Sequence, residues 1–516
     1  MKFLIRIIAV TLLTSAAVFA QGTAQIHGSV QDMTGSGVPG ASVKATQTDT
    51  GVTRTVASEA DGGYVLTNLP IGPYNLEITK DGFTTAVQSG IVLQVGSDPA
   101  IQVSLKVGAV SEKVNVEANA TQVETRSVGV GNVIENQRIL ELPLNGRQAT
   151  DLISLAGGAV QTGTSRGFGM RTGVLVSVAG GNSDGVQYNL DGAQHVNFFD
   201  GTGLPFPFPD ALQEFKISTS TQEAASGGRS GAQVNAVMKS GTNIFHGDVF
   251  EFLRNYKANA RDFFQVGQDG LKRNQFGGVL GGPIKKDKLF FFMGYQGTTV
   301  RQTPIASTVN VPTAAMLAGD FTAVASVACQ GRAITMTAPF VNGGTDAQGR
   351  TIWSLPVSSM SASARAIAQR LPQPIDSCGR VNTGNPLSEN DHEVNSRVDF
   401  QVSDKQTLFA RYMLVKQNIG VPYSLAPNDV LTAGGIGSDD QFNGITIGDT
   451  YVLNSSMVNS ARVYFNRIRA IKPGANMFGP QDVGIGCGGT VGCANSKYYT
   501  YQPNYLTVNE IGRAHV

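Results

Sequence analysis

The second half of the chain alternates apolar and polar side chains in segments of roughly ten residues. In Leu289–Gln296, Leu, Phe, Met and Tyr occupy every second position from 289 to 295. A period of two places successive side chains on opposite faces of a β-strand. Strands of this length with one apolar face are typical of barrels that cross a membrane. From about Ile244 onward, we therefore expect the first strands of a transmembrane β-barrel.

Other segments repeat this alternation, and the connections between them differ greatly in length. Arg397–Val402 and Thr407–Leu414 flank the tight turn Ser403–Gln406, whereas Thr303–Asn390 and Gln417–Asp440 are long. A second hairpin is expected to pair Ile445–Leu453 with Met457–Arg467. A soluble β-sandwich also alternates, but strand length and the contrast between short turns and long loops favour a barrel. About eight strand candidates can be identified.

Charge is scarce and balanced in this chain. The 39 basic residues nearly match the 38 acidic ones, which gives no support to a nucleic-acid partner. Only 15% of residues are charged, whereas soluble domains usually have about 25%. Strands with one face in lipid lower the charged fraction without producing any long apolar run.

The N-terminus has the pattern of an export signal. Lys2 and Arg6 precede the apolar run Ile7–Val18, and Ala20 ends a small-residue site. The run is shorter than the roughly 20 residues that a membrane-spanning helix needs. We therefore predict a signal peptide at residues 1–20, with export out of the cytoplasm.

Residues 22–107 form a first unit of short alternating runs separated by Gly, Pro and Asp turns. This spacing predicts an all-β sandwich. The side chains expected to face its core are Val65, Leu69, Tyr74, Leu76 and Ile78. The pattern resembles the carboxypeptidase regulatory-like domain, a prealbumin-like sandwich that lacks zinc chemistry.

A polar linker follows the sandwich and contains a short extended segment. Its residues are Val114, Asn115, Val116 and Glu117. Such a segment can add an edge strand to another sheet through main-chain hydrogen bonds. It can equally be a plain linker or the first strand of the next domain.

Residues from Val128 to Asn243 predict a small mixed α/β domain. Short helices are expected in Ile134–Leu142 and Asp151–Leu155. Strands are expected at Leu175–Val178, Val186–Leu190 and Phe215–Thr219. The Asp-Gly pair after Leu190 supplies a turn.

Six sequence blocks occur in this middle region and at the start of the barrel. They are Glu141–Arg147, Val186–Gly192, Gln213–Thr219, Gly228–Asn243, Phe245–Asn255 and Asn274–Ile284. Their order resembles the plug and first barrel strands of TonB-dependent outer-membrane receptors of the Oar-like branch. The resemblance implies a TonB box and plug at residues 108–243 and part of a twenty-two-stranded barrel at 244–510, in the outer membrane of a Gram-negative bacterium.

The same resemblance suggests sites and partners. Val114–Glu117 would be the TonB box, which the TonB energy-coupling complex engages from the periplasm. Plug residues that could contact a ligand are His195, Phe198, Phe199 and Asp200. An ordinary loop with aromatic packing is the simpler explanation for these four residues. The ligand itself, whether a small molecule, a glycan or a peptide, is not named by the sequence.

Four cysteines occur after the export signal. An even number in an exported protein favours disulfides. Cys487 and Cys493 flank a short glycine-rich segment, and Cys329 with Cys378 would tie one long insertion. We expect structural bonds rather than a metal site.

The C-terminal residues 511–516 read I-G-R-A-H-V. The bases ATCGGAAGAGCACACGTC encode them, and this string resembles a common sequencing adapter. We therefore expect natural sequence to end near Glu510, within an incomplete barrel.

Catalytic signatures are not found. The sequence contains no H-E-x-x-H, G-x-S-x-G or P-loop string, and its histidines are dispersed. We expect no enzyme activity, cofactor or metal. The favoured hypothesis is TonB-driven import of a ligand. The alternative is an outer-membrane carbohydrate-binding or adhesion protein without active transport.

Overall fold

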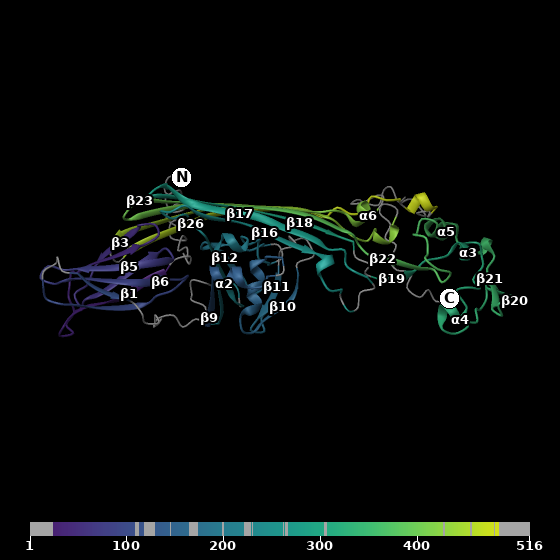
Figure 1. The fold of residues 1–516 in the computed structure, drawn as a ribbon, viewed down its shortest axis with the longest axis horizontal. Helices are drawn as coiled ribbons and strands as arrows, with labels where there is room; N and C mark the ends of the chain where they lie inside the picture. Colours follow the sequence, from purple (N-terminus) through teal and green to yellow (C-terminus); the bar gives the residue numbers. More distant parts are fainter. Residues whose placement is uncertain are drawn as a thin grey trace, which may run out of the picture.

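The computed structural model describes residues 24–484, apart from 109–112, 118–129, 145, 165–173, 199–200, 221–228, 230, 262, 264–266, 304–306, 427–428, 455–456 and 479. The predicted signal peptide, the Cys487–Cys493 pair and the C-terminal tail lie outside this range. Within it, no helix combines the length and the apolar character that crossing a membrane requires. The fold is mainly β, as the sequence predicts, and Figure 1 shows two units next to each other beneath a long sheet that forms the third.

The first unit is a sandwich of two sheets. The first sheet has the order β4 (Gly63–Leu69), β1 (Ala24–Asp32), β7 (Ala100–Leu105). The second has the order β3 (Thr53–Ala57), β2 (Ser42–Gln47), β5 (Gly72–Thr79), β6 (Thr85–Leu93), β8 (Lys113–Glu117). Alternate residues of both sheets point inward and form one apolar core.

Four of the five core residues predicted for the sandwich are buried. Leu69, Leu76 and Ile78 are fully enclosed, and so is the ring of Tyr74. The prediction for Val65 is wrong, because 36% of its surface is exposed. In β4 it is the flanking Tyr64 and Leu66 that point inward. The inward-facing positions of β4 therefore change from even-numbered to odd-numbered residues along the strand. The change occurs at Asn68, which adopts a positive φ of 54° just before the buried Leu69.

The linker segment Val114–Glu117 belongs to β8. This strand pairs in parallel with β6, Ala86 opposite Val114 and Ser89 opposite Glu117. It is the last strand in its sheet, so within the described residues its outer edge carries no neighbour. The sequence left open whether this segment is a linker, an edge strand or a strand of the next domain; in the structure it is an edge strand of the sandwich.

The middle unit, residues 130–238, packs a five-stranded sheet against short helices. The sheet order is β13 (Ala193–Gln194), β12 (Gln187–Leu190), β15 (Gln233–Met238), β14 (Leu212–Ser220), β9 (Val130–Glu135). Beside it lie α2 (Asn136–Glu141), the 3-10 helices η1 (Ala149–Leu155) and η2 (Pro209–Ala211), and the hairpin β10 (Ala159–Thr164) with β11 (Val174–Val178). The predicted helix at 134–142 thus begins two residues later, because Ile134 still belongs to the strand β9.

The third unit is a seven-stranded antiparallel sheet of long strands. Its order is β16 (His246–Asn255), β17 (Lys272–Lys285), β18 (Leu289–Gln302), β23 (Leu387–Ser403), β24 (Gln406–Ile419), β25 (Ser438–Asn454), β26 (Met457–Ile471). Neighbouring strands pair along nearly their whole length. The described strands leave the sheet open between β16 and β26.

The two faces of this sheet have different surroundings. One face, the outward face, exposes large apolar side chains, among them Ile447 and Val463, which pair across β25 and β26. The opposite face covers the middle unit, and Met413 and Phe442 belong to the same apolar core as residues of that unit. Figure 1 shows the middle unit beneath this curved sheet.

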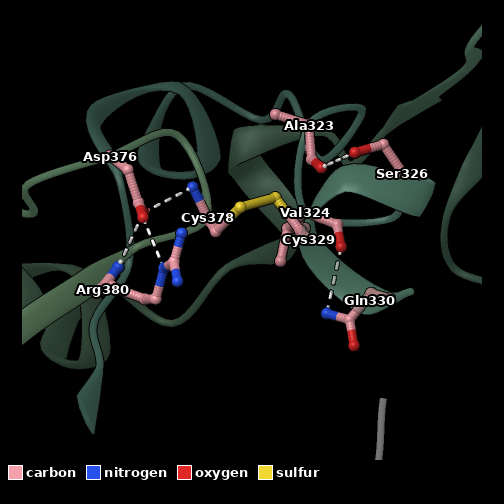
Figure 2. The surroundings of a disulfide bond; sticks show 8 residues. All are labelled: Ala323, Val324, Ser326, Cys329, Gln330, Asp376, Cys378 and Arg380. Carbon is pink, nitrogen blue, oxygen red and sulfur yellow. Dashed lines mark hydrogen bonds and ion pairs between the residues drawn. A yellow bond between two sulfur atoms is a disulfide. The ribbon is translucent and has the colours of Figure 1, made fainter. Parts of the chain in front are cut away.

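The connections define two ends of the sheet. At the short-turn end, β17 and β18 are joined by residues 286–288, and β23 and β24 by residues 404–405. At the long-loop end, residues 303–386 contain β19 (Ser307–Asn310), α3 (Ala314–Leu317), α4 (Val327–Gln330), β20 (Val341–Thr345), β21 (Thr351–Ser354), α5 (Ala362–Ala368) and β22 (Arg380–Thr383). Figure 2 shows the disulfide between Cys329 and Cys378, which links α4 to the turn before β22.

Candidate functional site

A polar cavity lies between the middle unit and the inner face of the sheet, toward the long-loop end. Its volume is about 1050 Å³. One wall is formed by residues 146–150 and the segment around Phe206 and Phe208 of the middle unit. The other wall is formed by inward side chains of β17, β18, β23 and β24, together with the loop before β25.

Arg147 dominates the wall formed by the middle unit. It forms an ion pair with Asp210, and its Nε donates to Oε1 of Gln296 at 3.2 Å. Its guanidinium also stacks on the rings of Phe250 and Phe252, 4.6 and 4.3 Å from their centroids. Burial lowers the pKa of Arg147, and the Asp210 carboxylate opposes that shift. Arg147 therefore ties this loop to the sheet with its charge partly desolvated.

The wall formed by the sheet is lined mainly by amides and carboxylates. Gln275 donates from Nε2 to the carbonyl of Gly146 at 3.1 Å, a further tie between the two walls. Glu393 accepts from the backbone N–H of Phe208 at 2.8 Å. Gln417 donates to Asp391 at 3.1 Å, while its Oε1 has no hydrogen-bond partner among the described residues.

At the rim near the loops, Lys472 donates to Oδ2 of Asp440 and to Oγ of Ser438, each at 2.6 Å. The lining as a whole carries three carboxylates, from Glu389, Asp391 and Glu393, and three cations, from Arg147, Arg273 and Lys472. Such a surface suits a polar ligand that bears both donors and acceptors. Within the described residues, no group of three or more His, Cys, Asp or Glu side chains is placed to hold a metal ion.

The predicted contact residue His195 lies outside this cavity lining. Only 1% of its surface is exposed, and its Nε2 donates to the carbonyl of Pro205 at 2.6 Å. Its ring packs edge-on against Phe206 and Phe442, with centroids 5.1 and 5.6 Å away. Burial, together with the nearby Arg411, lowers the pKa of His195 to about 3. His195 is thus a neutral packing residue that joins the middle unit to the sheet.

Of the other predicted contact residues, Phe198 is 75% exposed but does not line the cavity. Phe199 and Asp200 lie outside the described residues. A ligand-contacting role for this loop stays a prediction.

The sequence did not identify a charged cluster where the middle unit meets the sheet. Asp191 follows β12 with a positive φ of 52°, the turn that its Asp-Gly pair predicts. Its Oδ1 accepts from Nη1 of Arg397 at 2.8 Å, and its Oδ2 lies 3.5 Å from Nε of Arg411. Arg397 also pairs with Asp399 at 2.8 Å. The alternation of Arg397 with apolar residues indicated that its side chain points inward, but it did not indicate which carboxylate would pair with it.

A second contact region lies at the opposite end, between the sandwich and the other units. Asn243 donates from its backbone to the carbonyl of Asp49 at 2.8 Å, and Arg54 donates to the carbonyl of Asp404 in a short turn. Gln94 and Val95 hydrogen-bond to carboxylates of the middle unit. The sandwich therefore lies at the short-turn end, with β8 in the sheet next to this contact.

Glu214 is the central acid of that contact. It accepts the backbone N–H of Val95 at 2.8 Å, and Lys216 donates to the carbonyl of the same residue at 3.0 Å. Burial raises the pKa of Glu214 to about 7; the Val95 hydrogen bond opposes this shift and the neighbouring Glu135 adds to it. The contact thus depends on a carboxyl group that titrates near neutral pH.

Comparison with known proteins places these units in families. The outer membrane beta barrel domain matches residues 237–512, just over half of the chain. The carboxypeptidase regulatory-like domain matches residues 25–106. The TonB-dependent transporter Oar of Myxococcus xanthus is 29% identical over 313 residues, which cover 57% of this chain and 28% of that protein. The chain thus spans less than a third of the length of that relative.

Solved structures give more distant likenesses. The outer membrane transporter YddB of Escherichia coli aligns with a TM-score of 0.42 and 11% identity, over 66% of this chain and 39% of its own. The siderophore receptor PirA of Pseudomonas aeruginosa aligns with a TM-score of 0.38 and 10% identity, over 67% of this chain and 42% of its own.

The family matches agree with the open sheet of long strands, its apolar outward face and the sandwich ahead of it. They place the protein in the outer membrane. The chain belongs to the outer-membrane β-barrel family, as a homologue of the TonB-dependent transporter Oar with an N-terminal carboxypeptidase regulatory-like domain.

Proposed function

We propose that the protein is an energy-coupled receptor that binds a polar ligand in the cavity and imports it under the control of TonB. The middle unit is then the plug, the long-loop end is extracellular and the short-turn end periplasmic. The observation that carries the proposal is the position of the cavity, which lies between the plug loop 146–150 and the barrel wall, below the long loops. A ligand there touches both the plug and the wall, so binding can change how the two are held together.

Strand β8 is the proposed contact for TonB. Among the described residues, no strand pairs with its outer edge, and an extended segment of a partner can pair with such an edge by main-chain hydrogen bonds. It also connects the sandwich to the plug, next to the contact of Val95 with Glu214. A pull on this segment would therefore reach the plug directly.

The experiment removes residues 114–117 and measures binding of the purified periplasmic domain of TonB to the protein in detergent. A deletion of equal length, residues 119–122, is the matched control. We expect the first deletion to reduce TonB binding at least tenfold and the second to leave it within twofold of wild type. Equal binding by all three proteins would contradict the assignment of β8.

Ligand binding in the cavity is tested by a separate measurement. Leu387 lines the cavity, and a bulkier side chain there fills the space without removing a charge. Outer-membrane vesicles with the native protein should retain a polar metabolite that a Leu387→Trp variant does not, in untargeted mass spectrometry of co-purified small molecules. Identical small-molecule profiles would count against the cavity as the binding site.

The alternative of a glycan-binding sandwich receives less support. Stacking on sugar rings uses exposed aromatic side chains, but Tyr64 and Tyr74 are buried and Phe83 packs against the core. These are the three aromatic residues between 24 and 108. We propose no catalytic activity, since the relative is named as a transporter.

A further inference from the structure

The outward face of the barrel sheet carries a set of cations near the long-loop end, which we call the cationic ring. Its members are Lys272, Arg301, His392, Lys416, Arg467 and Arg469. All six are exposed, and of the six only His392 is among the residues that line the cavity. They come from β17, β18, β23, β24 and β26, and thus from all but two of the seven strands.

Strand register shows that the six side chains share the outward face. Residues directly opposite in antiparallel strands point to the same side. Lys272 is opposite Arg301. One continuous row joins His392 to Lys416, Gln441 and Arg469. On β18 this row continues at Gly297, which is two residues from the exposed Tyr295 and four from Arg301. Residues an even number of positions apart in a strand point to the same side, so all six side chains face outward.

From one strand to the next, the cations occupy positions that shift along the strand axis, as the strand tilt of a barrel requires. Lys272 on β17, like its partner Arg301, lies four residues above the row of Gly297. Arg467 on β26 lies two residues below that row, a drop of six residues over the five steps from β17 to β26. Strands about 4.8 Å apart and tilted by roughly 40° shift by about 4 Å, or about 1.2 residues, per step at constant depth. Five steps predict about six residues, so Lys272 and Arg467 lie at one depth in the membrane, and the other four cations lie within about two residues of that depth.

The apolar band beneath the ring descends in the same direction. Its uppermost exposed phenylalanines are Phe276 on β17 and Phe465 on β26, whereas Ile471 at the end of β26 lies beyond the ring. The row of Phe465 meets β17 at Leu280, four residues from Phe276. The band and the ring therefore follow one tilt, and the ring stays on the long-loop side of these phenylalanines.

Tyrosines mark the boundary between band and ring. The hydroxyl of Tyr295 is 2.8 Å from Nδ1 of His392, and their rings stack. The hydroxyl of Tyr412 donates to Asn443 at 3.1 Å. Aromatic girdles of barrels lie at the membrane–water interface, so cations just above them are at headgroup level.

Little acidic charge opposes the ring. Asp439 faces outward and pairs with Arg469 at 3.2 Å, and Glu251 lies on the edge strand β16. No ion pair of Lys272, Lys416 or Arg467 is formed within the described part of the chain. Three strongly basic side chains are thus directed at the headgroup layer with their charge uncompensated.

We propose that the cationic ring binds the phosphate groups of the outer-leaflet lipid, the phosphorylated glycolipid of the bacterial outer membrane. Lys and Arg side chains at headgroup depth attract anionic lipid, and several around one circumference hold several phosphates at once. The ring would fix the depth of the barrel and surround it with tightly held lipid. This inference depends on the extracellular placement of the long loops but not on the cavity or on TonB.

The test uses the full chain, purified from outer membranes in a non-ionic detergent. A ring variant combines Lys272→Gln, Lys416→Gln and Arg467→Gln. A matched control combines Lys285→Gln, Lys286→Gln and Lys405→Gln, three exposed lysines at or beside the short turns. Native mass spectrometry counts bound lipid A, and a titration compares lipid A with its dephosphorylated form.

We expect the ring variant to bind lipid A at least tenfold more weakly than wild type, and the control variant to bind like wild type. Dephosphorylated lipid A should bind wild type as weakly as lipid A binds the ring variant. Equal binding by ring variant and wild type, or no preference for the phosphorylated form, would overturn the proposal. TonB binding by the ring variant should be unchanged; this separates failure here from failure of the proposed function.

Discussion

The sandwich and the barrel sheet are built from the same period-two alternation, yet their apolar residues face opposite ways. In the sandwich, side chains such as Leu76 and Ile78 point inward and meet the second sheet. In the barrel sheet, equally apolar side chains such as Ile447 and Val463 point outward and are half exposed or more. Alternation therefore identifies a strand with two unlike faces, but the surroundings decide which face is the interior.

The interiors differ accordingly. The sandwich core is made of aliphatic and aromatic side chains. The interface of plug and barrel contains apolar contacts too, but also the Asp191 cluster and the Arg147–Asp210 pair. Burial of apolar side chains stabilises the sandwich. Between plug and barrel, buried ion pairs contribute as well, and the loss of one partner leaves the other charge buried and unpaired.

Asp191→Ala is expected to have the largest effect, because it leaves Arg411 without its acidic partner inside the protein. Removing one partner of a buried pair costs about 3–5 kcal/mol. Urea unfolding of the protein in lipid vesicles measures this loss. The exposed pair of Asp376 with Arg380 supplies the control, since Asp376→Ala should cost far less stability. Similar losses for the two variants would contradict the contrast between interiors.

Leu76→Ala tests the apolar interior. The side chain is fully buried in the sandwich, and its truncation should cost about 2–5 kcal/mol through lost burial and the cavity it creates. Hydrogen–deuterium exchange of β5 peptides reports local stability within the full chain. Val65→Ala, at the position that the structure shows to be exposed, should change exchange little. Equal hydrogen–deuterium exchange rates in the two variants would contradict the assignment of inward-facing residues in β4 and β5.

Ile447→Arg compares exposed positions in the two regions. Ile447 is 52% exposed on the barrel face and Val92 is 53% exposed on the sandwich. A cation facing the lipid interior costs about 2–4 kcal/mol, whereas one in water costs within about 0.5 kcal/mol. Ile447→Arg should therefore lower the urea midpoint in vesicles, and Val92→Arg should not. Equal midpoints would mean that the outward face does not contact lipid.

His195 should make plug stability depend on pH. Its folded-state pKa of about 3 is below the unfolded value of 6.5, so its contribution is complete above pH 6.5 and declines as pH falls toward 3. At pH 5 the loss is about 2 kcal/mol. Unfolding of wild type and His195→Phe, compared at pH 7.5 and pH 5, should show a smaller pH effect in the variant. An identical pH dependence would exclude His195 as its source.

Most of the architecture could be predicted from the sequence, because strand faces and turns depend on residues close together in the chain. The alternation of 289–295, the long and short connections and the ordered blocks from Glu141 to Ile284 were enough for fold class and family. The candidate site could not be predicted to the same extent. Arg147 stands in one of those blocks, but its partners Asp210 and Gln296 are distant in sequence.

The amino-acid sequence by itself determined that the chain is a sandwich followed by a small α/β unit and lipid-facing strands, since each of these is encoded by local periodicity. Only the tertiary structure decided that Asp191 meets Arg397, that His195 is enclosed, and that β8 joins the sandwich. The physical reason is that ion pairing, burial and strand pairing depend on which distant segments come together. Asp191 and Arg397 are 206 residues apart, and no local pattern links the two.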